Sequence, residues 1–170
     1  MDKIHVTVAA IIKRNDHYLL VKERASSGDI VFNQPAGHVE LKESLPDAVI
    51  REVKEETGID FTPTGLIGTY LLSPAANGKT YLRFCFVGNV PDNQQPSPQD
   101  PEILENCWFT LDEIAAMDRK ELRSALVLQC LTDYLDGKRI PLETVNYYND
   151  EHHLADGCYQ SLSLSQNMAE

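Results

Sequence analysis

The segment 46–57 most constrains what this chain can fold into, because helix signals stand at both of its ends. Ser44 is a typical N-cap residue, and Pro46 suits the first helical turn because its backbone angle is already close to helical. Asp47 favours the positive end of the helix dipole, and Gly58 is a typical residue for ending a helix. The sequence therefore predicts an α-helix over this segment.

Three glutamates share one face of the predicted helix. At about 100° per residue, Glu52, Glu55 and Glu56 fall within an arc of roughly 100°. Val49 and Val53 belong to the adjoining apolar stripe, so the acidic face borders the core. Such a face either lies in water, as most acidic helix faces do, or forms a cleft wall. A cleft wall of carboxylates would bind a hard divalent cation such as Mg²⁺, which takes oxygen ligands.

The chain is acidic, with 15 lysines and arginines against 26 aspartates and glutamates and a net charge of −11. Nucleic acids and anionic membranes bind to basic surfaces, so this charge disfavours both as partners. A phosphate-bearing substrate would need a cation between itself and such a protein. Divalent ions held by carboxylates provide that cation, which favours the cleft-wall interpretation.

The sequence carries no sign of export or membrane insertion. Its longest early apolar run, Val6–Ile12, is too short to span a bilayer. The cysteines are widely spaced and follow no disulfide or metal-binding pattern; they are Cys85, Cys107, Cys130 and Cys158. We therefore expect a cytoplasmic protein with free thiols.

The order of predicted elements indicates one mixed α and β domain. β-branched and alternating runs predict strands, with a hairpin at Asn15-Asp16 and a second turn at Asn77-Gly78. The expected strands are His5–Ile12, Tyr18–Val21, Gly65–Leu72, Thr80–Val90 and Cys107–Thr110. Between them, Val31–Glu40 is expected to form short strands that are broken around Pro35 and Gly37. Apolar periodicity predicts two further helices, Leu111–Met117 and Lys120–Leu135.

Two segments lie outside these elements. Residues 91–101 are rich in proline and predict an exposed loop. We expect residues 1–145 to form the domain and residues 146–170 to form a polar tail. The tail either packs on the domain, mediates dimer contacts or stays disordered, so a monomer and a homodimer both remain open.

The predicted helix is the centre of a longer pattern, which reads Gly37, five residues, Glu43, seven residues, Arg51-Glu52-Val53, one residue, Glu55-Glu56, one residue and Gly58-Ile59. This 23-residue pattern resembles the signature box of the Nudix hydrolases, with every fixed position occupied. The resemblance implies an α/β/α sandwich with a mixed β-sheet, in which the box forms a loop, a helix and a loop. It also implies hydrolysis of a nucleoside diphosphate linked to another group.

The resemblance assigns roles to the charged residues of the box. Glu52 is similar to a metal ligand that also acts as general base, and Glu55 and Glu56 to further metal ligands. Arg51 corresponds to the residue that orients a box carboxylate, and Glu43 is a further acidic member. The implied cofactor is Mg²⁺, with Mn²⁺ as a substitute.

Other positions follow from the same resemblance. Gly37 permits backbone geometry that a side chain would obstruct, and the backbone carbonyl of Ala36 reaches the metal in relatives. Glu102 stands where some relatives supply another acid, although a solvated loop residue fits equally well. Arg24 stands where relatives use a basic residue against phosphate, with an ordinary surface cation as the alternative.

One bacterial branch of the family, the NudJ-type phosphatases, is similar over roughly residues 3–145. The resemblance rests on the string 33–40, Asn-Gln-Pro-Ala-Gly-His-Val-Glu, and on Leu82-Arg83-Phe84. It implies hydrolysis of nucleoside tri- and diphosphates and of hydroxymethylpyrimidine diphosphate, with release of phosphate. Gln34 and His38 then help to define the pocket, unless they are ordinary loop residues. Arg83 is a charge in a strand that otherwise reads as buried, which indicates that it faces the substrate.

Two alternative functions remain open at this point. Pro74 follows the box at about the spacing at which ADP-ribose pyrophosphatases carry a proline, which favours a nucleoside diphosphate-X pyrophosphatase. A non-catalytic Nudix domain that binds a nucleotide as a sensor is the alternative from another class, since a fold does not guarantee an activity. The complete set of box carboxylates favours an enzyme.

Overall fold

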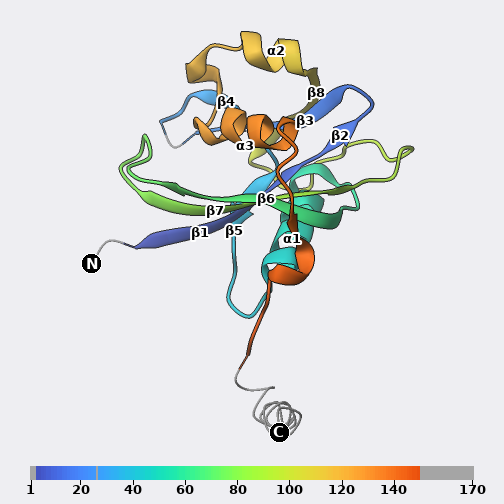
Figure 1. Cartoon of the computed structure of the whole chain (residues 1–170). Helices are drawn as coiled ribbons and strands as arrows, with labels where there is room; N and C mark the ends of the chain where they lie inside the picture. The colour runs from blue at the N-terminus through green and yellow to red at the C-terminus, as the bar shows by residue number, and fades with distance from the viewer. Residues whose placement is uncertain (1–2, 26, 150–170) are drawn as a thin grey trace, which may run out of the picture.

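The computed structural model describes residues 3–25 and 27–149, which form two β-sheets and the helices that cover them (Figure 1). Most of the predicted tail, from residue 150 onward, and Cys158 lie outside the described residues. No helix in the described part of the chain is long and apolar enough to cross a membrane.

The first sheet has five strands in the order β5-β1-β7-β6-β9. Strands β1 and β7 run parallel and the other neighbours run antiparallel, so the sheet is mixed, as the family resemblance implies. The strands are β1 (Ile4–Ile11), β5 (Ala36–His38), β6 (Thr62–Leu72), β7 (Thr80–Asn89) and β9 (Ile140–Pro141).

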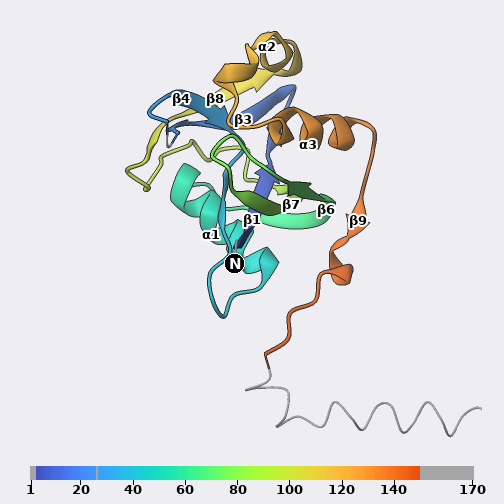
Figure 2. The ribbon, with the colours of Figure 1, turned by 90° about the vertical axis from the view of Figure 1, so that its left-hand side faces the viewer.

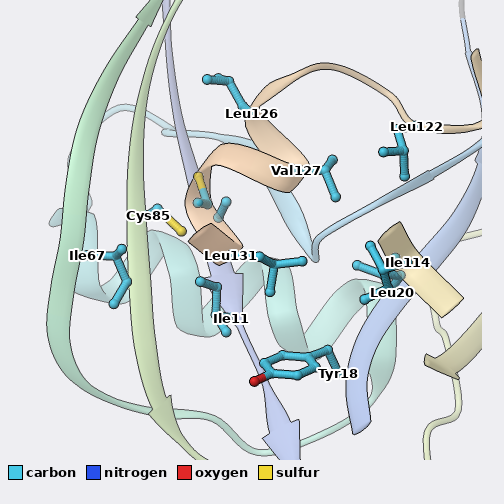
Figure 3. Close-up of a cluster of buried hydrophobic side chains, with 12 residues drawn as sticks. Ile11, Tyr18, Leu20, Ile67, Cys85, Ile114, Leu122, Leu126, Val127 and Leu131 are labelled. Carbon is cyan, nitrogen blue, oxygen red and sulfur yellow. The ribbon is translucent and has the colours of Figure 1, made fainter. Parts of the chain in front are cut away.

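Helices cover both faces of this sheet because β1 is apolar on both sides. Val8 and Ala10 pack in one buried cluster with Val49 of α1 (Leu45–Thr57). Ala9 and Ile11 point to the opposite face, as successive residues of a strand do, and pack in a second cluster with α3 (Leu126–Leu135) (Figure 3). Figure 2 shows α1 and α3 on either side of the sheet. The expected α/β/α sandwich is therefore confirmed.

The second sheet contains β2 (Lys13–Arg14), β3 (His17–Arg24), β4 (Ile30–Asn33) and β8 (Ile103–Thr110), with β3 paired to all three others. The predicted turn at Asn15-Asp16 is present, with Asn15 at a φ of 52°. The predicted partner strand is wrong, however, because β1 pairs with β5 and β7, and the strand that pairs with β3 across this turn is the short β2. β1 is buried on both faces and so takes a central place in the other sheet.

Helix α1 (Leu45–Thr57) forms as its end signals predict. The side chain of Ser44 accepts a hydrogen bond from the backbone N–H of Asp47 at 3.1 Å. At the other end, Gly58 takes a left-handed conformation with a φ of 72°, and its N–H donates to the carbonyl of Lys54 at 2.8 Å. Both cap predictions are confirmed.

The predicted loop after β7 packs against the last turn of α1. The N–H of Ser97 donates to the carbonyl of Thr57 at 2.7 Å, and the N–H groups of Gln99 and Asp100 donate to the carbonyl of Glu55 at 2.8 and 2.9 Å. The last carbonyls of a helix lack partners within it, and these loop donors supply them. The loop thereby fixes the end of the helix that carries the glutamates.

Replacing Gly58 with alanine tests this junction. A Cβ at Gly58 would be strained at positive φ and would also overlap the carbonyl oxygen of Ser97. We expect the free energy of unfolding to fall by about 3 kcal/mol, measured by urea denaturation. Gly137→Ala is the matched control, because Gly137 has a φ of 78° and open space around it. The control isolates the backbone strain of about 1–2 kcal/mol, and equal losses in both variants would contradict the clash with the loop.

The predicted helix Lys120–Leu135 is only partly present. The chain forms a short 3₁₀ turn, η1 (Arg119–Glu121), and then extends before α3 begins at Leu126. Leu122 is 5% exposed in the core, and the N–H of Arg123 donates to the carbonyl of Phe32 at 2.8 Å. These tertiary contacts hold the segment extended although its sequence favours a helix.

The predicted helix Leu111–Met117 is confirmed as α2 (Leu111–Ala116), which is capped by Thr110. A second 3₁₀ turn, η2 (Leu142–Thr144), follows β9. Among the described cysteines, Cys85, Cys107 and Cys130 are free thiols, as expected.

Candidate active site

A cleft of about 960 Å³ opens between the two sheets. The first sheet contributes residues of β1, β5, β6 and β7 to its walls, and the second contributes residues of β3 and β4. Helix α1, the loop after β3, the turn at 74–77, the loop at 100–102 and the segment 119–126 also line it. Most of the residues singled out in the sequence lie on or beside this cleft.

Glu52 and Glu56 of α1 both line the cleft, next to strand β5. The carboxylate of Glu56 accepts a hydrogen bond at 2.8 Å from the backbone N–H of Ala36. A Cβ on Gly37 would overlap the carboxylate of Glu52, so only glycine leaves room for that side chain. The close approach of β5 and α1 therefore explains why the pattern begins with a glycine.

Arg51 binds several groups around these carboxylates. Its Nε and Nη2 atoms bind both carboxylate oxygens of Glu43, at 3.0 and 2.7 Å. Its Nη1 donates to Glu52 Oε1 at 2.9 Å and to Glu55 Oε2 at 3.2 Å, and Nη2 also donates to the carbonyl of His38 at 3.0 Å. A planar guanidinium suits this role because its five donors have fixed directions. Arg51 thus orients Glu52 and ties the helix to the loop before it.

Burial disfavours the charged forms of both cleft glutamates. Desolvation raises the pKa of Glu56 to about 9, although the hydrogen bond from Ala36 opposes the shift. Desolvation also raises the pKa of Glu52, while its hydrogen bond from Arg51 lowers it. Glu56 is only 5% exposed, and no basic side chain among the described residues forms an ion pair with it. A bound cation would offset this cost.

Further acids face the same cleft. Glu102, which the family resemblance singled out, lines it together with Asp100. Glu23 of β3 also lines it and accepts a hydrogen bond from Asn33 Nδ2 at 3.2 Å. The sequence analysis missed Glu23, because no motif or helical spacing marks it; only the pairing of β3 with β4 brings it to the cleft.

Basic residues line other parts of the cleft. Arg83 is 8% exposed, and its guanidinium lies 3.4 Å from Gln34 Oε1. In the described part of the chain, no carboxylate lies within ion-pair distance of it, which leaves a buried positive charge facing the cleft. Arg119, Lys120 and Arg123 line it as well, and Arg123 lies 3.8 Å from Glu23. The sequence analysis missed these three, since it placed two of them in a continuous helix.

The remaining candidate residues lie at or beyond the margin of the cleft. His38 lines it, whereas Gln34 lies behind it at 1% exposure beside Arg83. The Glu55 side chain is 49% exposed and reaches Arg51. Arg24 lies outside the lining and donates to the carbonyl of Gly28 at 2.9 Å. Gln34 and Arg24 therefore lie outside the cleft lining.

A model of the NUDIX domain family matches residues 3–129 of the chain. The chain belongs to the Nudix hydrolase family. A phosphatase NudJ from Escherichia coli K12 is 36% identical over 149 residues, which cover 88% of this chain and 95% of the relative. A NUDIX hydrolase from Nitrosomonas europaea is 47% identical with a TM-score of 0.80, over 86% of this chain and 98% of the other.

A more distant structure shares the fold alone. The NUDIX domain of Shewanella oneidensis NrtR, solved in complex with ADP ribose, is 17% identical with a TM-score of 0.68. The match covers 81% of this chain and 90% of that one. As a Nudix hydrolase with phosphatase-named relatives, the protein is an enzyme that acts on phosphorus-containing acid anhydrides.

Nudix hydrolases generally use divalent metal ions, and the donors of this cleft fit such an ion. Glu52, Glu56 and Glu23 offer only oxygen ligands, and burial has raised the pKa of each. No three acidic, histidine or cysteine side chains in the described part of the chain converge closely enough to enclose a metal. This open arrangement fits Mg²⁺, which usually binds one or two carboxylates and completes its shell with waters and phosphate oxygens.

Proposed function

We propose that this Nudix enzyme hydrolyses phosphoanhydride bonds of nucleoside tri- and diphosphates with Mg²⁺ as its cofactor, for which Mn²⁺ substitutes. The observation that carries the proposal is that Glu52, Glu56 and the buried Arg83 line one cleft, where Arg83 has no carboxylate partner among the described residues. Carboxylates bind the cation that a polyphosphate requires, and a buried guanidinium binds phosphate oxygens. The similarity to a relative named phosphatase NudJ supports release of phosphate. The resemblance over residues 33–40 adds hydroxymethylpyrimidine diphosphate to the proposed substrates.

Glu52, Glu56 and the backbone carbonyl of Ala36 are the residues that would hold the metal. When bound, the ion supplies charge neutralisation for phosphate oxygens and lowers the pKa of a coordinated water. Glu102 is a further ligand of the same chemistry, and its N–H is fixed by a 2.8 Å hydrogen bond to Asp100 Oδ1. Glu55 either supports the metal site through its ion pair with Arg51 or binds the metal after its side chain rotates toward the cleft.

Glu52 is the general base in this proposal. Arg51 holds its Oε1 at 2.9 Å, which leaves Oε2 to accept a proton from the water that attacks phosphorus. The side chain is 12% exposed, so bulk water competes little for that proton. Arg83 holds the phosphate that becomes the leaving group or remains on the nucleoside, and Arg123 provides a second cation at the opposite wall.

An ADP-ribose pyrophosphatase is the second candidate. Pro74, the residue that suggested this activity in the sequence, lines the cleft together with the turn that follows it. A NUDIX domain of the same fold has been solved in complex with ADP ribose. The two candidates share the anhydride chemistry and differ in the group beyond the second phosphate.

A substrate panel tests the proposal. The purified protein with Mg²⁺ is given nucleoside triphosphates, nucleoside diphosphates, ADP-ribose and hydroxymethylpyrimidine diphosphate, and orthophosphate and pyrophosphate are measured separately. We expect orthophosphate from the nucleotides and little turnover of ADP-ribose. Preferred turnover of ADP-ribose would favour the second candidate. Nucleotide binding without any turnover would contradict the proposed hydrolysis and favour the nucleotide sensor.

A further inference from the structure

We infer that Tyr81 and His38 form a subsite that stacks on the aromatic heterocycle of the substrate. The inference rests on the proposed function, since it concerns the part of that substrate that is not phosphate. Both side chains line the cleft that contains Glu52 and Arg83. Neither was placed in this role by the comparisons, and Tyr81 was not singled out in the sequence.

The register of the first sheet brings these residues to one face. Tyr81 and Arg83 are two apart on β7, so they point to the same side of the sheet. Thr7 of β1 pairs with both Arg83 and His38, and His5 pairs with Tyr81. The cleft floor therefore presents an aromatic pair beside the buried cation, as a substrate with a ring next to its phosphates requires.

The rings of His5, His38 and Tyr81 contact one another. His5 lies 5.4 Å from His38 in an edge-to-face arrangement and 5.2 Å from Tyr81 in a tilted one, between ring centroids. These separations fall within the range of favourable aromatic contacts. His5 points to the same face of the sheet but is absent from the cleft lining, so it packs beside the other two at the margin of the cleft.

These rings are not part of the hydrophobic core. Neither buried cluster includes Tyr81, His38 or His5, and His38 is exposed. Leu72 pairs with Tyr81 across the sheet and lines the cleft beside it, which adds an apolar neighbour for a ring. Apolar and aromatic groups beside charged groups in one cleft are typical of a site for a ring bearing phosphates.

The polar atoms around Tyr81 are already engaged. Asn77 Nδ2 donates to the hydroxyl of Tyr81 at 2.9 Å, and Asn77 Oδ1 accepts from the N–H of Lys79 at 3.1 Å. The subsite therefore offers ring faces to the substrate, because the Asn77 amide and the Tyr81 hydroxyl, which could hydrogen-bond the edge of a base, bind each other. Every nucleobase has such a face, so stacking of this kind discriminates little among bases.

Steady-state kinetics of Tyr81→Leu and Tyr81→Phe test the inference. Leucine keeps the apolar volume but removes the aromatic face, and phenylalanine keeps the face but removes the hydroxyl. Because one stacked base is lost, we expect Tyr81→Leu to raise KM about tenfold for ATP, GTP, CTP and UTP alike. We expect kcat to stay at the wild-type value and Tyr81→Phe to keep the wild-type KM. Tyr147→Leu is the control, because Tyr147 is 43% exposed and outside the cleft lining.

Inorganic tripolyphosphate separates the ring from the phosphates. It has the anhydride bonds and no ring, so either no hydrolysis or hydrolysis that Tyr81→Leu leaves unchanged agrees with the inference. An equal rise in KM for tripolyphosphate and nucleotides would overturn it, as would a wild-type KM for nucleotides in Tyr81→Leu. Tyr81→Phe as impaired as Tyr81→Leu would also overturn it, because the hydroxyl and not the ring face would then matter.

A binding measurement keeps this test separate from the proposed hydrolysis. Calorimetry with adenosine, which carries the ring but no phosphate and so needs no metal, measures the ring subsite without turnover. Weaker binding to Tyr81→Leu than to wild type would support the subsite even if the panel revealed no hydrolysis. Equal binding to both proteins would reject the subsite while leaving the anhydride chemistry standing.

Discussion

Glu52→Gln is expected to lower kcat for nucleotide hydrolysis by more than about 10²–10⁴-fold. That range is the typical contribution of a general base alone, and Glu52 is also a proposed metal ligand. Glutamine has nearly the same shape and accepts the same hydrogen bond from Arg51, now 2.9 Å long. The variant therefore removes a charge and a proton acceptor and leaves the packing in place. Orthophosphate release under saturating substrate measures the loss.

A matched control for this variant is Glu105→Gln. Glu105 is 59% exposed in its side chain, forms an ion pair with Lys22 and lies outside the cleft lining. We expect the control to keep wild-type kcat, and both variants to keep the wild-type melting temperature. Substantial turnover in Glu52→Gln would assign the proton transfer to another group.

Arg51→Leu is expected to lower both activity and stability. The change removes a guanidinium that contacts Glu43, Glu52 and Glu55 and the carbonyl of His38. Glu43 and Glu52 are mostly buried, with side chains 16% and 12% exposed, so their charges lose a compensating partner. We expect the free energy of unfolding to fall by about 3 kcal/mol, the lower end for breaking a buried ion pair. Urea denaturation measures this loss.

Arg51→Lys separates the charge of Arg51 from its geometry. Lysine restores a positive charge but has no fork that can bind both oxygens of Glu43 and still reach Glu52. We therefore expect Arg51→Lys to recover part of the stability and to remain impaired in kcat. Wild-type stability and kcat in Arg51→Leu would show that the network has no such role.

The helix of the site was predictable because its signals are local. Ser44 and Gly58 cap α1 as expected, and the helical spacing of 100° per residue correctly placed Glu52 and Glu56 on the side where the cleft lies. The same spacing placed Glu55 with them, but that side chain contacts Arg51 and is half exposed. A hundred-degree arc is wider than the part of the helix that the cleft contacts.

The rest of the cleft depends on contacts between distant segments. Glu23 reaches it through the pairing of β3 with β4, and Arg123 through a hydrogen bond of its N–H to the carbonyl of Phe32. Neither contact has a sequence spacing that would reveal it. The first part of the expected helix, over 120–125, was wrong for the same reason, since burial of Leu122 in the core decides the local conformation.

Removal and return of metal tests the central claim most directly. The protein is treated with EDTA, dialysed, and assayed for orthophosphate release from a nucleoside triphosphate while Mg²⁺ is added back. We predict no turnover without metal and recovery with Mg²⁺ or Mn²⁺, with a higher metal requirement in Glu56→Gln. Full turnover by the metal-free protein would contradict the account, because the charge neutralisation of the phosphate oxygens that it assigns to the metal would then be unnecessary.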